Sequence, residues 1–77
     1  MRFDVDLDLR GEVCPYVFIK ARLMLEDMAP GKVLRCVTDY PPAAQNVPKN
    51  FSTIGEEVLS VRQRDESTWE IYVKKRG

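Results

Sequence analysis

The spacing of the hydrophobic residues changes at Cys14-Pro15, and this change constrains the fold more than any other feature. Upstream, hydrophobic residues alternate with charged ones, which is the period of a half-buried strand: Phe3, Val5, Leu7 and Leu9. Downstream, they recur at helical spacing: Val17, Phe18, Ala21, Met24, Leu25 and Met28. Proline is favoured at the first helical position, because its missing N–H would have no partner there. The sequence predicts a strand over 3–9, a turn over 10–13 and a helix over 15–28.

The rest of the chain predicts a second strand and helix, followed by two further strands. Ala29-Pro30-Gly31 ends the first helix, and a valine- and leucine-rich strand follows over 32–38. A second helical pattern contains Pro48, which predicts either a turn followed by a short helix or one kinked helix. Hydrophobic alternation then predicts two strands, joined by a tight hairpin at 65–67.

The element order βαβαββ predicts an α+β fold. A strand, a crossover helix and a second strand form a right-handed unit with parallel strands. The whole order gives a two-layer α/β sandwich, in which two helices cover one face of a four-stranded mixed sheet. The 77 residues are expected to form one domain over 1–77 with a modest core. This size suits a carrier, a binding module or a small exchange catalyst better than a multistep enzyme.

The composition excludes several classes of function. Twelve basic and twelve acidic residues cancel, so no general attraction to nucleic acid or anionic membranes is expected. The basic end, Lys74-Lys75-Arg76, is expected to be a frayed, solvated tail or a minor contact for an acidic partner. The chain has two cysteines and no histidine, which makes a poor zinc site and leaves no imidazole base for a cysteine protease. We therefore expect neither a metal nor a cofactor.

The distribution of hydrophobic residues indicates a cytoplasmic protein. No apolar run approaches the ~20 residues that span a bilayer. The N-terminus shows no basic segment followed by an apolar one, so no secretory signal is recognised. Without export, the two cysteines are expected to be thiols rather than a structural disulfide.

Cys14 is the residue with the most pointed chemistry. The partial positive charge of a helix N-terminus stabilises a thiolate, the reactive form of cysteine. Ligand sites also cluster beyond the carboxyl ends of parallel strands, where Cys14 is expected beside Asp39. Arg10 and Lys20 are candidates to lower the pKa of this thiol, and Glu12 would raise it. The alternative for Lys20 is a solvated lysine on the exposed face of the helix. The alternative is that Cys14 is a small apolar residue that fills the core.

Two other features have two interpretations each. Cys36 lies in the second predicted strand, where it is either a core residue or a resolving partner for Cys14. A disulfide between them would require Cα atoms within about 7 Å. Tyr16, Ile19 and Leu23 lie opposite the core stripe of the first helix. This second apolar stripe is either covered by the second helix or a docking surface for a partner.

Taken together, these residues resemble the TusA/SirA-like family of small sulfur carriers over nearly the whole chain. The resemblance begins with Leu9-Arg10-Gly11 and Cys14-Pro15 and continues with Lys20 in the first helix. It extends through residues that match the later family pattern in order: Gly31, Leu34, Asp39, Pro41, Asn46-Val47-Pro48, Phe51 and Gly55.

The resemblance implies that Cys14 carries sulfur as a persulfide. A cysteine desulfurase or another persulfide donor would load the carrier, which would pass sulfur to an acceptor protein, toward tRNA thiolation or cofactor synthesis. Pro15 and Gly11 would shape the motif, and Arg10, Lys20 and Asp39 would line the rim that partners meet. The chain departs from the family's Cys-Pro-x-Pro signature, because Val17 replaces the second proline and restores an N–H donor.

Two alternatives to a monomeric sulfur carrier remain at this stage. The same element order occurs in RNA-binding domains, so a regulatory module that binds RNA or protein is one alternative. The neutral net charge and the lack of an aromatic-basic pattern disfavour direct nucleic-acid binding. The second alternative is a thiol redox protein that uses Cys14 and Cys36.

Overall fold

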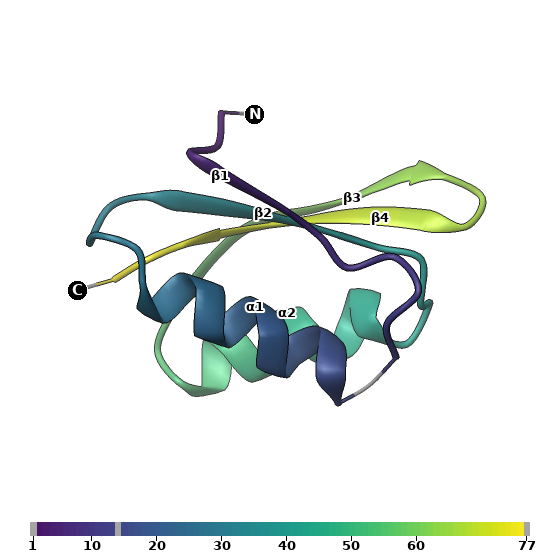
Figure 1. Ribbon diagram of the computed structural model, residues 1–77, viewed down its shortest axis with the longest axis horizontal. Helices are drawn as coiled ribbons and strands as arrows, with labels where there is room; N and C mark the ends of the chain where they lie inside the picture. The colour runs from purple at the N-terminus through teal and green to yellow at the C-terminus, as the bar shows by residue number, and fades with distance from the viewer. Residues whose placement is uncertain (1, 14, 77) are drawn as a thin grey trace.

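The computed structural model describes residues 2–13 and 15–76 (Figure 1). The elements follow the predicted order βαβαββ: β1 (Val5–Asp8), α1 (Tyr16–Glu26), β2 (Val33–Thr38), α2 (Ala43–Thr53), β3 (Glu57–Asp65) and β4 (Thr68–Lys74). The helix α1 begins one residue later and ends two residues earlier than the predicted range of 15–28. The hairpin forms where it was expected, because the Asp65 carboxylate accepts a hydrogen bond from the Ser67 N–H at 2.9 Å.

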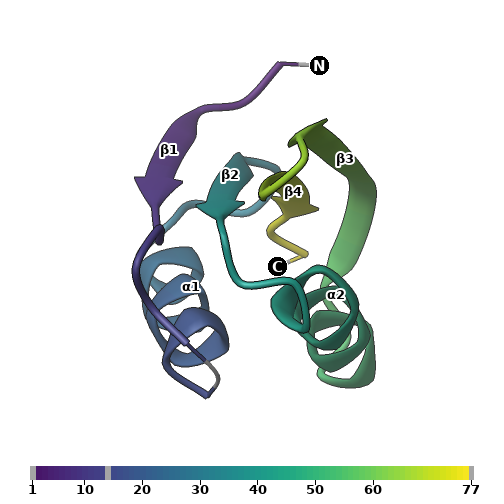
Figure 2. The ribbon, with the colours of Figure 1, turned by 90° about the vertical axis from the view of Figure 1, so that its right-hand side faces the viewer.

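The four strands form one mixed sheet, as predicted. The strand order is β1-β2-β4-β3, with β1 parallel to β2 and the other neighbours antiparallel. Figure 2 shows both helices beneath the same face of the sheet. The α+β sandwich is therefore confirmed. Its one parallel pair brings the carboxyl ends of β1 and β2 to the same edge.

The core lies between the sheet and the two helices. From α1, the buried side chains are Val17, Ala21 and Leu25, which is the stripe that the helical spacing predicted. The two helices meet through Phe18 and Phe51, whose rings pack edge to face with centroids 5.0 Å apart. This packing fixes α1 and therefore the position of its N-terminal end.

Pro48 lies inside α2, which runs without a break from Ala43 to Thr53. The alternative of a turn followed by a short helix is therefore wrong. Val47 and Phe51 are fully buried on the core side of this helix. Their burial offsets the hydrogen bond that proline cannot donate within a helix.

Phe3 does not continue the alternation of β1, contrary to the prediction. The strand begins at Val5. The ring of Phe3 stacks on the Arg35 guanidinium, whose Cζ lies 4.2 Å from the ring centroid. Arg35 projects from the face of the sheet that lacks helices, where it pairs with Asp6 and Glu70. The cation–π contact and these ion pairs explain why Phe3 covers that face and not the core.

The predicted frayed tail is also wrong as far as Arg76. The Lys75 carbonyl accepts a hydrogen bond from the Gly31 N–H at 2.8 Å, and the Lys75 N–H donates to the Lys32 carbonyl at 2.9 Å. The Glu56 carboxylate accepts a hydrogen bond from the Arg76 N–H and lies 3.7 Å from Lys75 Nζ. These bonds hold the basic segment against the end of the sheet.

Among the described residues, no helix has both the length and the apolarity to cross a membrane.

Candidate functional site

The carboxyl ends of β1 and β2 are joined beyond the sheet. The Leu9 N–H donates to the Val37 carbonyl at 2.7 Å, which extends the parallel pairing by one residue. Two residues later, the Gly11 N–H donates to Asp39 Oδ1 at 2.9 Å. Cys14 itself lies outside the described residues, so the site is built here from its neighbours on both sides.

Gly11 and Asp39, two of the predicted site residues, are therefore in direct contact. Gly11 has a φ of +89°, a conformation that side-chain-bearing residues rarely adopt. The end of β2 is ordered as well, because Thr38 is buried and its Oγ1 accepts a hydrogen bond from the Tyr40 N–H at 3.2 Å. Asp39 thus projects from a defined turn toward the turn that precedes Cys14.

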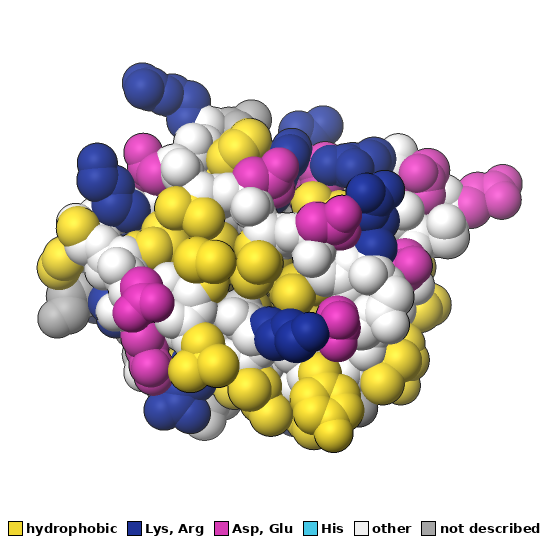
Figure 3. All heavy atoms as spheres, viewed as in Figure 1, with side chains coloured by type: hydrophobic (Ala, Val, Ile, Leu, Met, Phe, Trp, Pro, Cys, Tyr) yellow, Lys and Arg dark blue, Asp and Glu magenta, His cyan; other side chains and the backbone are white. Residues whose placement is uncertain are grey.

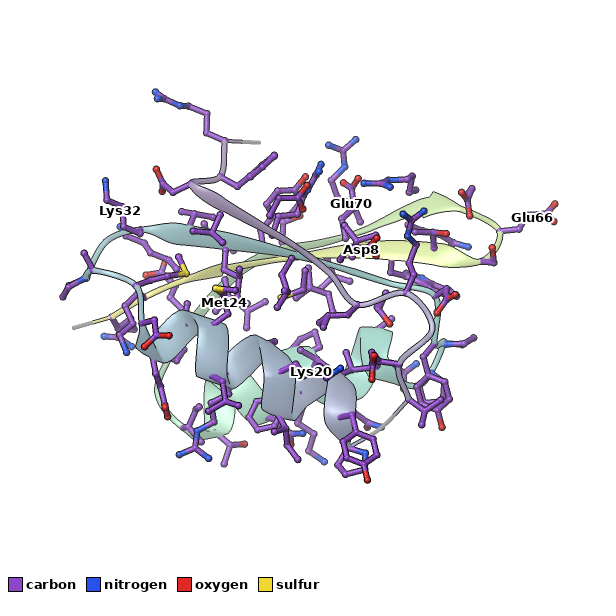
Figure 4. All side chains as sticks on the ribbon, viewed as in Figure 1. Asp8, Lys20, Met24, Lys32, Glu66 and Glu70 are labelled. Atoms are coloured by element: carbon purple, nitrogen blue, oxygen red, sulfur yellow. The ribbon has the colours of Figure 1, made fainter. Side chains whose placement is uncertain are left out.

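The two predicted cations of the site are each paired with a carboxylate. Lys20 Nζ lies 2.8 Å from Glu12 Oε2, and Figure 4 shows Lys20 directed from α1 toward the preceding loop. Arg10 forms two side-chain hydrogen bonds with Asp8, both of 2.9 Å. The Arg10 guanidinium lowers the pKa of Asp8 to about 2. Both cations therefore act locally as members of neutral pairs.

The start of α1 is held by backbone hydrogen bonds to Val13. The Val13 carbonyl accepts hydrogen bonds from the Tyr16 N–H at 2.8 Å and the Val17 N–H at 3.2 Å. The N–H that Val17 has in place of the family's second proline thus has a partner. Pro15 occupies the N-cap and not the first helical position, so the helix begins one residue later than predicted.

Electrostatics at the start of α1 favour an anion. The helix has 11 residues, and its first turn contains no acidic residue. The aligned peptide dipoles of a helix give its start a partial positive charge, although the Tyr16 and Val17 N–H groups already donate to the Val13 carbonyl. Residue 14 precedes the N-cap directly in the chain, which places its sequence neighbours Val13 and Pro15 at this end of the helix.

The second apolar stripe of α1 is exposed. The exposed fractions are 56% for Tyr16, 44% for Ile19 and 58% for Leu23, so α2 does not cover the stripe. Figure 3 shows hydrophobic side chains gathered along the lower edge of the molecule, over α1. Val13 is also exposed, and it precedes Cys14 directly in the chain. Val13 was not among the predicted site residues, because a single valine in a turn has no periodicity.

Cys36 is a core residue. Its side chain is fully buried in β2, and it packs within the main hydrophobic cluster between the sheet and the helices. Burial raises the pKa of this thiol to about 12. A thiol that stays protonated and enclosed is a poor nucleophile. Cys36 therefore lacks the access and the ionisation that a resolving cysteine requires.

Comparison with known proteins identifies the class. The sulfurtransferase TusA family profile matches residues 5–75. A protein of Archaeoglobus fulgidus, named "Putative sulfur carrier protein", is 47% identical over 70 residues, which cover 91% of this chain and 80% of that one. A protein of Thermotoga maritima with the same name is 38% identical over 68 residues, covering 88% and 86%. The chain belongs to the TusA family, and the resemblance seen in its sequence is confirmed.

Solved structures confirm the fold. A SirA-like protein from Desulfitobacterium hafniense superposes with a TM-score of 0.82 at 24% identity, covering 96% of this chain and all of that one. A protein from Helicobacter pylori superposes with a TM-score of 0.71 at 22% identity, covering 94% and 97%. The βαβαββ sandwich is therefore shared with proteins of much lower sequence similarity.

Proposed function

We propose that this protein carries sulfur as a persulfide on Cys14. The observation that carries the proposal is the match to the TusA family over residues 5–75, a range that includes the Cys14-Pro15 motif. The described neighbours support it, since the start of α1 favours an anion and the other cysteine is buried with a raised pKa. This combination leaves Cys14 as the cysteine suited to exchange.

The proposed chemistry consists of two exchanges at sulfur. The Cys14 thiolate attacks the outer sulfur of a donor persulfide, R–S–SH. A new S–S bond to Cys14 forms as the donor S–S bond breaks. The electron pair of the broken bond leaves with the donor as R–S⁻, and the proton stays on the transferred sulfur. An acceptor thiolate then attacks the outer sulfur of the Cys14 persulfide, and Cys14 leaves as a thiolate.

The neighbours of Cys14 have separate proposed roles. Gly11 and Pro15 set the path of the chain into α1. The Lys20–Glu12 pair holds the turn against the helix, and Arg10 lies on the rim in its pair with Asp8. Neither the family's chemistry nor this step requires a metal or a prosthetic group.

We propose that the exposed stripe of Tyr16, Ile19 and Leu23 receives the protein partner. Exchange requires the partner to approach Cys14, and Tyr16 follows that residue by two positions. The charges beside the stripe are paired, Lys20 with Glu12 and Arg22 with Glu26, which favours an apolar partner surface over nucleic acid. A stable interface buries about 800 Å² per partner. Three side chains are fewer than such an interface needs, so we propose a transient contact made by a monomer.

The partners are assigned by chemistry. The donor is a protein that presents a persulfide, such as a cysteine desulfurase. The acceptor is a protein thiol that leads to a thiolated tRNA or a sulfur-containing cofactor. We place this relay in the cytoplasm, where thiols stay reduced.

The proposal is tested by loading the protein with sulfur. The wild-type protein, Cys14→Ser and Cys36→Ala are incubated with a cysteine desulfurase and cysteine, and separately with inorganic polysulfide, before intact-mass measurement. The wild type and Cys36→Ala are expected to gain one sulfur atom, and Cys14→Ser none. Loss of two hydrogens in place of a gain of sulfur would support a redox protein. Salt-dependent RNA binding that persists in Cys14→Ser, with no gain of sulfur in the wild type, would support a binding module.

A further inference from the structure

We infer that Asp39 is a positioning residue for Cys14, and that it acts as a hydrogen-bond acceptor for the Gly11 N–H. The inference rests on the proposed function of Cys14. The family resemblance implied for Asp39 only a place on a rim that partners meet. The structure gives its carboxylate a partner within the chain, Gly11, three residues before Cys14.

The Gly11–Asp39 bond connects parts of the chain that are 28 residues apart. It lies beyond the last backbone bond of the parallel pair, from Leu9 to Val37. The segment that leads to Cys14 would otherwise leave the sheet at Leu9. The bond therefore extends the ordered edge of the sheet by two residues toward the nucleophile.

Residues 11, 12 and 13 each have a contact that holds this segment in place. Gly11 is held by the end of β2, Glu12 by Lys20 on α1, and Val13 by the first turn of α1. The last two both attach the turn to α1. The contact with Asp39 is the one of these three that ties the turn to β2. The Glu12 N–H also donates to the Leu9 carbonyl at 3.1 Å, which attaches the turn to the end of β1. Loss of Asp39 would therefore let the turn shift relative to β2 while its attachments to β1 and to α1 persist.

The role requires an acceptor and not a charge. Asparagine keeps an Oδ1 acceptor on a side chain of nearly the same shape, whereas alanine removes it. A role on a charged rim would need the carboxylate, so asparagine would then be as harmful as alanine. The pair Asp39→Asn and Asp39→Ala separates the two roles.

The test measures the bond and its consequence separately. Hydrogen exchange of the Gly11 amide, followed by NMR, is expected to be slow in the wild type and Asp39→Asn and several-fold faster in Asp39→Ala. The rate of sulfur uptake from a charged cysteine desulfurase is expected to fall about three- to tenfold in Asp39→Ala and to be largely retained in Asp39→Asn. Asp27→Ala, which removes an exposed carboxylate at the other end of α1, is the matched control and is expected to behave as the wild type.

A second readout excludes a general loss of structure. Alkylation of Cys14 by iodoacetamide above the pKa of the thiol, and the thermal midpoint, are expected to change little in either Asp39 variant. Equal losses of uptake in Asp39→Asn and Asp39→Ala would overturn the inference in favour of a charge. Unchanged Gly11 exchange in Asp39→Ala would overturn the bond itself. A wild type that takes up no sulfur would overturn the proposed function and the positioning role with it, whereas the exchange data would still report the bond.

Discussion

At the scale of single residues, the two cysteines differ in environment. Cys14 is flanked by neighbours held at the positive end of α1, whereas Cys36 is enclosed between the sheet and the helices. The core interpretation of Cys36 agrees with strand periodicity, because Leu34 and Cys36 share one face of β2, and both are fully buried. The roles proposed for the two thiols therefore follow from strand periodicity and helix polarity.

The buried thiol gives stability a specific dependence on alkaline pH. The pKa of Cys36 is about 12 in the folded protein and 9.0 for an ordinary thiol. Below pH 9 both states hold the proton, so the thiol contributes no pH dependence. Above pH 9 the unfolded state ionises first, which costs about 2 kcal/mol of stability at about pH 10.5. Urea unfolding at pH 9 and at about pH 10.5 is expected to show a smaller loss of unfolding free energy for Cys36→Ala than for the wild type. Equal losses would contradict this assignment.

At the scale of elements, the sequence predicted every helix and strand. The hydrophobic residues of β1 alternate with charged ones, and those of α1 recur at helical spacing. Both patterns arise because one face of each element is buried. The ends were less accurate. The strand β1 begins at Val5, because Phe3 is drawn to Arg35 on the opposite face. No pattern within residues 3–9 reveals a contact with a residue so much later in the chain.

The contacts that shape the site were likewise beyond the reach of periodicity. Cys14 was predicted beside Asp39, since parallel strands end together, but the hydrogen bond between Gly11 and Asp39 was not predicted. The sequence left Lys20 either beside Cys14 or in solvent, whereas the structure pairs Lys20 with Glu12. Such pairings depend on side-chain geometry at exposed positions, where several partners are of similar energy.

Pro48 provides a test of helix α2. A proline inside a helix removes one backbone hydrogen bond and crowds the preceding turn, which costs about 3 kcal/mol. Its rigidity in the unfolded state returns roughly 1 kcal/mol. Pro48→Ala is therefore expected to raise the free energy of unfolding by about 1–2 kcal/mol, as measured by urea unfolding. Sulfur uptake is expected to be unchanged, because Pro48 lies outside the site. A destabilised Pro48→Ala protein would contradict the expectation that Pro48 costs α2 a backbone hydrogen bond.

At the scale of the whole molecule, one end of the sandwich combines the start of α1, the joined ends of β1 and β2, and the apolar stripe on α1. The opposite face of the sheet is covered by paired charges around Arg35. The fold therefore separates a surface suited to protein contact from one that is closed by its own ion pairs.

The docking proposal predicts a selective effect of a charge on the stripe. Leu23→Glu is expected to slow sulfur uptake from a protein donor about tenfold or more, because a buried unpaired carboxylate opposes docking. Uptake from polysulfide, which needs no docking surface, is expected to be unchanged. Val61→Glu introduces the same charge at a similarly exposed residue of β3 and is expected to leave both rates unaltered. Equal slowing by Leu23→Glu and Val61→Glu would remove the stripe from the proposal.

The most direct test of the central claim locates the transferred sulfur within the chain. Trypsin cleaves after Arg10 and Lys20 and after Arg35 and Lys49, which separates Cys14 on residues 11–20 from Cys36 on residues 36–49. After loading by a persulfide donor and alkylation, mass spectrometry is expected to find the added sulfur atom on peptide 11–20, and to find it lost after incubation with an acceptor thiol. Sulfur on peptide 36–49, or on neither peptide, would contradict the account.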